Sequence, residues 1–94
     1  MASHSLITLS NTVATRLTPN GTHSGMDVTL QNVNNLGAIY VGVSDLVTSS
    51  DYGYRIMPGH AISFELSGKD SLYGISELDG LKLAMIEINL ESQR

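Results

Sequence analysis

Hydrophobic and polar residues alternate along much of this chain with a period of two, which is typical of β-strands. The clearest example is segment 26–31, which reads Met-Asp-Val-Thr-Leu-Gln. Such alternation predicts a strand with one buried face and one wet face. No long stretch keeps apolar residues at helical spacing between recognisable caps, so the pattern does not favour a helical fold.

Similar patterns predict a strand in most parts of the chain, with Gly, Pro, Asn and Asp between the strands. About seven or eight strands at spacings of about 8 to 12 residues predict an all-β fold. We expect a small antiparallel two-sheet β-sandwich, with a small barrel as the alternative architecture. The segments expected as strands are 5–9, 12–17, 25–33, 39–43, 54–57, 61–66, 72–76 and 81–90.

Turn residues suggest how these strands connect. The turn at 34–37 and the Asp-Gly pair at 79–80 both predict hairpins. The polar segment 44–51 reads as a loop that crosses between sheets, with Leu46 or Val47 tucked beneath it. Pro58-Gly59 suits a type II turn. Gly42, within a strand, indicates a bulge or the close approach of another group.

A chain of 94 residues is expected to form one domain. We assign residues 12–91 to the sandwich, 1–11 to an N-terminal arm and 92–94 to a frayed end. Segment 5–10 is β-prone and nearly uncharged. It either adds to the sheet edge of a neighbouring subunit through Leu6, Ile7 and Leu9, or pairs within its own sheet.

Composition narrows the functional classes. The net charge is −4, and the five Lys and Arg residues are spread along the chain, so no basic stripe is present to bind nucleic acid. No apolar run reaches the about 20 residues that span a bilayer, and we expect neither a signal peptide nor membrane binding. The lack of cysteine agrees with synthesis in a reducing cytoplasm.

No catalytic or metal-binding motif emerges. His4, His23 and His60 lack the spacing of metal ligands, and the acidic residues form no recognisable catalytic pair. We therefore expect no enzyme, no metal and no cofactor. These acidic residues are Asp45, Asp51, Glu65, Asp70, Glu77 and Asp79.

Aromatic and cationic residues near the polar loop are the better candidates for binding. Tyr and Arg are enriched at protein interfaces, so Tyr52, Tyr54 and Arg55 are candidate contacts together with Leu46 and Val47 of the loop. The same tyrosines and Arg55 also suggest an alternative, a carbohydrate-binding module that recognises surface glycans.

Several segments resemble a family of small bacteriophage virion proteins, over roughly residues 26–88. The resemblance departs from the family pattern at His60, where an acidic residue is usual, and at Gly74, where Ala is usual. The matching segments are Leu30-Gln-Asn-Val-Asn34, Ala38-Ile-Tyr-Val-Gly42, Ser44-Asp45, Val47-Thr48, Gly53-Tyr54, Ile56-Met-Pro-Gly59 and Leu72-Tyr-Gly-Ile-Ser76.

This resemblance implies a β-sandwich used as a structural part of the phage particle. The expected function is that of a head decoration protein that binds the major capsid protein on the outside of the capsid, after assembly in the host cytoplasm. It implies a homo-oligomer such as a trimer. A tail or neck component is the alternative within the same class.

Overall fold

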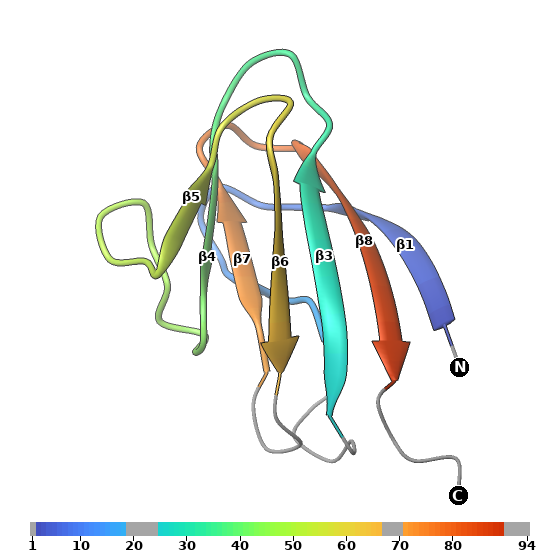
Figure 1. Ribbon diagram of the computed structural model, residues 1–94. Coiled ribbons are helices and arrows are strands. Elements are labelled where there is room, and N and C mark those ends of the chain that lie inside the picture. The colour runs from blue at the N-terminus through green and yellow to red at the C-terminus, as the bar shows by residue number, and fades with distance from the viewer. Residues whose placement is uncertain (1, 19–24, 67–70, 90–94) are drawn as a thin grey trace, which may run out of the picture.

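The computed structural model describes residues 2–18, 25–66 and 71–89, and these residues form eight strands and no helix (Figure 1). The all-β prediction is confirmed. The strands are β1 (Ala2–Thr8), β2 (Thr15–Arg16), β3 (Met26–Asn32), β4 (Ile39–Gly42), β5 (Tyr54–Ile56), β6 (Ala61–Leu66), β7 (Tyr73–Ser76) and β8 (Lys82–Asn89).

The strands form two antiparallel sheets of four. Sheet A has the order β1-β8-β3-β6, and sheet B has the order β2-β7-β4-β5. Neither sheet closes on itself, so the fold is a two-sheet sandwich and not the barrel considered as an alternative.

The main core lies between the sheets and follows the period of two. In β3 every second residue is buried, from Met26 to Asn32, while Asp27, Thr29 and Gln31 are exposed. This agrees with the expected half-buried strand. The buried apolar residues of this core are Leu9, Leu17, Met26, Val28, Leu30, Ile39, Val41, Ile56, Leu66, Leu72, Leu83 and Met85.

The expected hairpin between segments 25–33 and 39–43 is wrong. β3 pairs with β6 and β8 in sheet A, whereas β4 pairs with β5 and β7 in sheet B. Residues 33–38 therefore carry the chain from one sheet to the other. The buried Asn32 side chain donates to the carbonyl oxygens of Gly37 and Ile56, both at 2.9 Å, and so bonds to this connection and to β5.

The expected hairpin at Asp79-Gly80 is also wrong, although the turn itself is present. Gly80 has a positive φ of 88°, but its N–H donates to the carbonyl oxygen of Leu9 at 3.0 Å. β7 and β8 lie in different sheets. The turn is thus a crossing between sheets, and the segment after β1 supplies the partner for its backbone.

Segment 44–51 was expected to cross between sheets, and this prediction is wrong as well. The loop 43–53 connects β4 to β5, which are neighbours in sheet B. The expectation that Leu46 or Val47 lies beneath the loop is confirmed for Val47, which is 5% exposed.

The turn at Pro58-Gly59 agrees with the prediction. Gly59 has a positive φ of 81°, and the N–H of His60 donates to the carbonyl oxygen of Met57 at 3.0 Å, as in a type II turn. Because β5 lies in sheet B and β6 in sheet A, this turn also carries the chain between the sheets.

The segment expected as an N-terminal arm contributes β1, which pairs with β8 along its length and forms one edge of sheet A. Pairing within its own sheet is thus what the structure contains. Leu17, at the end of the segment expected as a strand at 12–17, is buried, and Thr18 is buried as well. The frayed end expected at 92–94 lies outside the described residues.

Candidate interaction surfaces

Two exposed apolar surfaces stand out among the described residues, and they lie on different sheets. The first, the loop surface, consists of the exposed side chains of Val43, Leu46, Tyr52 and Arg55 beside sheet B. The second, the outer face of sheet A, is centred on Leu6, Ala84, Ile86 and Ile88. In Figure 1 the loop between β4 and β5 extends from one side of the molecule, and β1 lies at the opposite side.

Hydrogen bonds within the loop fix its conformation. Thr48 and Asp51 exchange two backbone bonds, of 2.9 and 3.2 Å, and the N–H of Ser50 donates to Oγ1 of Thr48 at 3.2 Å. The N–H of Leu46 donates to Oγ of Ser44 at 3.2 Å. These local bonds satisfy backbone groups that a strand ladder would otherwise pair. The loop is therefore a structured protrusion.

The Val47 side chain holds this protrusion against sheet B. Val47 packs with Ala38, Tyr40 and Ile75 on the face of sheet B that points away from the main core, and Ala14 and Tyr73 pack against this cluster. The glycine at position 42 makes room for it, because a Cβ there would lie 3.0 Å from Cγ2 of Val47. The loop thus covers a second, smaller core.

Tyr52 lies over the same face of sheet B. Its ring centroid is 4.8 Å from that of Tyr40, with a tilt of 42° between the rings. Tyr52 keeps 40% of its surface exposed, and Val43 and Leu46 each keep 74%. A hollow of about 270 Å³ lies among these side chains and Gly53. An apolar group of a partner could enter there without displacing the loop.

The structure separates Tyr54 from Tyr52 and Arg55, the other two residues expected to bind a sugar. Arg55 lies opposite Tyr40 in the ladder, on the outer face of sheet B. Tyr54 alternates with it and points to the other face, where its ring meets Phe64 edge-on at 6.5 Å. Tyr52 and Tyr54 therefore do not present their rings side by side, so the arrangement does not favour the carbohydrate-binding alternative.

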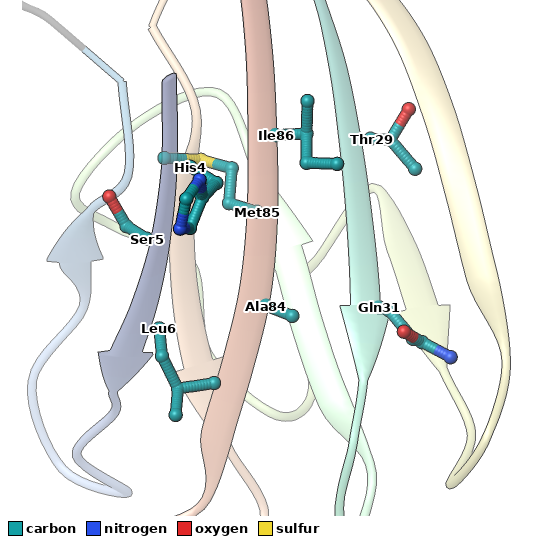
Figure 2. A pocket seen from close by; sticks show the side chains of 8 residues that line it. All are labelled: His4, Ser5, Leu6, Thr29, Gln31, Ala84, Met85 and Ile86. Atoms are coloured by element: carbon teal, nitrogen blue, oxygen red, sulfur yellow. The ribbon is translucent and has the colours of Figure 1, made fainter.

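The outer face of sheet A is unusually apolar for a solvent-facing surface. Leu6 is 61% exposed, Ile86 is 51% exposed and Ile88 is 47% exposed. The register places Leu6 beside Ala84, and Ala84 beside Gln31. Because Ala84 is small, a shallow depression of about 380 Å³ lies over it, and Figure 2 shows its methyl group between the longer side chains of Leu6 and Gln31.

Charged residues lie at the two ends of this apolar region. Lys82 lies at one end of β8, where its Nζ donates to Oγ1 of Thr8 at 3.0 Å. At the other end, Asp27 and Glu65 are direct partners on neighbouring strands. Between these ends, the outward residues of β3 and β6 are neutral and either polar or small: Thr29, Gln31, Ala61 and Ser63.

The structure divides the residues expected at an interface into two groups. Leu6, Leu46, Tyr52, Tyr54 and Arg55 are exposed and accessible to a partner. In contrast, Leu9 and Val47 are buried in the two cores, and Ile7 packs partly against the main core, so these three contribute to stability.

Sequence reasoning missed the exposure of Ile86 and Ile88. In segment 82–88 both alternating phases are apolar, since Leu83 and Met85 form one and Ala84, Ile86 and Ile88 form the other. A period of two shows that the phases lie on opposite faces, but it does not show which face is buried. Apolar residues in both phases of segment 82–88 are the sequence signal that could have revealed an exposed apolar outer face.

Groups that could support chemistry are scattered in the part of the chain that the structure describes. No three His, Cys, Asp or Glu side chains gather there as a metal site would require. Glu77 and Asp79 instead accept hydrogen bonds from the backbone N–H groups of Ala38 and Asn11, at 2.9 and 3.3 Å. His23 lies outside the described residues.

The fold and these surfaces define a small antiparallel β-sandwich with exposed apolar patches of the kind that mark protein interaction sites. None of the described segments is a helix long and apolar enough to cross a membrane. Comparisons with protein-family models, with curated proteins and with solved structures found no match.

Proposed function

We propose that this chain is a non-enzymatic structural protein of a bacteriophage particle, which decorates the outer surface of the capsid by binding the major capsid protein. The sequence resemblance suggests the setting, and the loop surface suggests the means. The single observation that carries the proposal is a loop, held by internal hydrogen bonds, that exposes Val43, Leu46 and Tyr52.

The fixed conformation of the loop and the side chains that it exposes favour binding. Its conformation is already fixed by internal hydrogen bonds and by the Val47 anchor, so little conformational entropy remains to be lost when a partner binds. Leu46 and Tyr52 offer apolar surface, while Arg55 on the same side of sheet B offers hydrogen-bond donors. Such groups are typical of the centres of protein interfaces.

The interface that one loop surface forms with the capsid is small, but a capsid presents many equivalent sites. A decoration protein that joins neighbouring capsid subunits stabilises the shell through the sum of many modest interfaces, and multivalent attachment strengthens each of them. A low content of charged residues, 15%, suits a surface that must lose water without burying unpaired charges.

The test is to mix the purified protein with empty, expanded capsids of the phage that encodes it. We expect saturable co-sedimentation and a higher capsid melting temperature. Leu46→Asp should weaken binding at least tenfold, because it places a charge in the apolar contact. Leu36→Asp is the matched control, since Leu36 is 71% exposed but lies on the connection 33–38.

Two results would count against the proposal: no binding to capsids by the wild-type protein, or equal loss of binding in the Leu46 and Leu36 variants. Binding to purified tails in place of capsids would assign the chain to the tail or neck, the alternative within the same class.

A further inference from the structure

We propose that two copies of this chain pack against each other through the outer faces of sheet A, around a two-fold axis. The axis lies in the interface, runs across the strands and passes between Ala84 and Ile86 of β8. This dimer goes beyond the proposed function, because it uses a surface on the other sheet from the loop surface.

The register of sheet A makes this face complementary to itself. One row of outward residues runs across the strands through Leu6, Ala84 and Gln31, and the next row runs through His4, Ile86 and Thr29. A half turn about the stated axis exchanges the two rows. Ala84 of each copy then faces the partner's Ile86.

This exchange places a projecting side chain of each copy over a depression in the surface of the other. Ile86 is 51% exposed, whereas the depression of about 380 Å³ lies over Ala84 (Figure 2). Each copy thus inserts one isoleucine into the hollow of the other, and Leu6 packs beside the partner's His4. Sheets that pack face to face interdigitate their side chains in this way, with strands nearly aligned.

Charge complementarity selects a second copy in this orientation. The half turn brings the Lys82 end of one copy over the Asp27 end of the other. Asp27 and Glu65 are direct partners within one chain, and like charges in that position repel each other. The partner's Lys82 faces Ile88, and Asp27 lies beside Ile88 on β3. Once its Nζ turns from Thr8 toward β3, Lys82 relieves this repulsion, and the symmetry forms the contact twice.

The available area agrees with a specific but moderate dimer. Four strands spaced about 4.8 Å apart and about six residues long outline roughly 400 Å² on each copy. Because projecting side chains add to this outline, two copies bury on the order of 1,000 Å², near the lower bound for a specific interface. The dimer should therefore depend on protein concentration.

Sedimentation equilibrium of the full chain over a range of concentrations tests the proposal. We expect the mass to rise from 10.1 kDa toward twice that value as the concentration increases. Ile86→Asp should weaken the dimer at least tenfold. Val13→Asp is the matched control, because Val13 is 66% exposed and lies outside sheet A.

Charge reversal provides a second test that does not depend on the apolar contact. Lys82→Glu and Asp27→Lys should each weaken the dimer, since each places like charges together across the interface. The double variant restores opposite charges and should recover dimerisation. Thermal unfolding followed by circular dichroism verifies that each variant is folded.

The proposal is overturned if the wild-type protein remains a monomer throughout, if it forms trimers, or if the double variant fails to recover. Capsid binding by the folded Ile86→Asp variant is measured alongside. Loss of the dimer without loss of capsid binding separates this inference from the decoration function, so each can fail without the other.

Discussion

At the scale of single residues, Asn32 shows how one buried polar side chain organises a corner of the sandwich. It is fully buried, yet its amide group is hydrogen bonded on both sides. Nδ2 donates to the carbonyl oxygens of Gly37 and Ile56, and Oδ1 accepts from the N–H and the side chain of Asn34, at 3.1 and 2.7 Å. Asn32 thereby links β3, the crossing connection and β5.

Replacing this residue should be costly. Asn32→Ala leaves the buried carbonyl oxygen of Ile56 and the part-buried carbonyl oxygen of Gly37 without their donor, and each unsatisfied buried group costs about 1–3 kcal/mol. We expect the free energy of unfolding to fall by about 2–4 kcal/mol, measured by urea denaturation, with no change in the m-value. Asn35→Ala, at an exposed position in the same connection, should change it by less than about 0.5 kcal/mol. Equal effects of the two variants would contradict this role.

The sequence indicates that Asn32 is buried, but it does not indicate the hydrogen-bond partners of its side chain. The alternation in segment 26–31 indicates that position 32 continues the buried phase of β3. An asparagine there breaks the apolar pattern, which marks it as unusual. Its partners lie 5 and 24 residues further along the chain, and only the tertiary structure brings them to the Asn32 side chain.

At the scale of elements, turn positions could be predicted from the sequence, but strand pairing could not. Asp79-Gly80 and Pro58-Gly59 both form turns with a positive φ at glycine, as their residue types require. Local backbone chemistry does not specify which sheet the next strand joins. That choice depends on distant partners, such as Leu9, whose carbonyl oxygen accepts from Gly80.

The loop 43–53 offers a test of how an element is anchored. Gly42→Ala places a Cβ 3.0 Å from Cγ2 of Val47, so the anchor must shift, and we expect a loss of about 1–3 kcal/mol. Val47→Ala removes the anchor and should cost about 2 kcal/mol. The double variant should lose less than the sum by about 0.5 kcal/mol or more, because Val47→Ala removes the Cγ2 contact and leaves only Cβ of residue 47, 3.1 Å from the new methyl group.

Urea denaturation of the four proteins in this cycle measures the coupling directly. Ser49→Ala, at an exposed position of the same loop, serves as the control for a change that leaves the anchor intact. Strict additivity of the Gly42 and Val47 variants would show that the two residues do not interact and that the loop is held by other contacts.

At the scale of the whole molecule, the sandwich class could be predicted because it depends on periodicity, turn spacing and the lack of helix signals. The apolar outer face of sheet A could not, since it depends on which phase of β8 faces the core. Leu83 is fully buried, whereas Ile86 lies outside. The packing of sheet A on sheet B makes this choice, and it leaves an apolar surface that a second copy can cover.

The position of β1 at the edge of sheet A leads to the last prediction. The N–H of Leu9 donates to Leu81 at 2.8 Å, and pairs alternate along an antiparallel ladder, so Ser5 directs its N–H toward β8. His4 directs its N–H toward the free edge. Proline is tolerated in a strand only where its missing N–H has no partner. Ser5→Pro should therefore cost about 2–3 kcal/mol, and His4→Pro less than about 1 kcal/mol.

Urea denaturation at protein concentrations below those at which the proposed dimer forms measures the difference between these two variants. If residues 1–11 formed a detachable arm, both substitutions would leave the unfolding midpoint unchanged. A large loss for Ser5→Pro alone would show that β1 is an integral strand of the sandwich. Because Leu6 and His4 reach the outer face of sheet A from β1, the same result would also fix the part of the proposed dimer surface that β1 contributes to the folded domain.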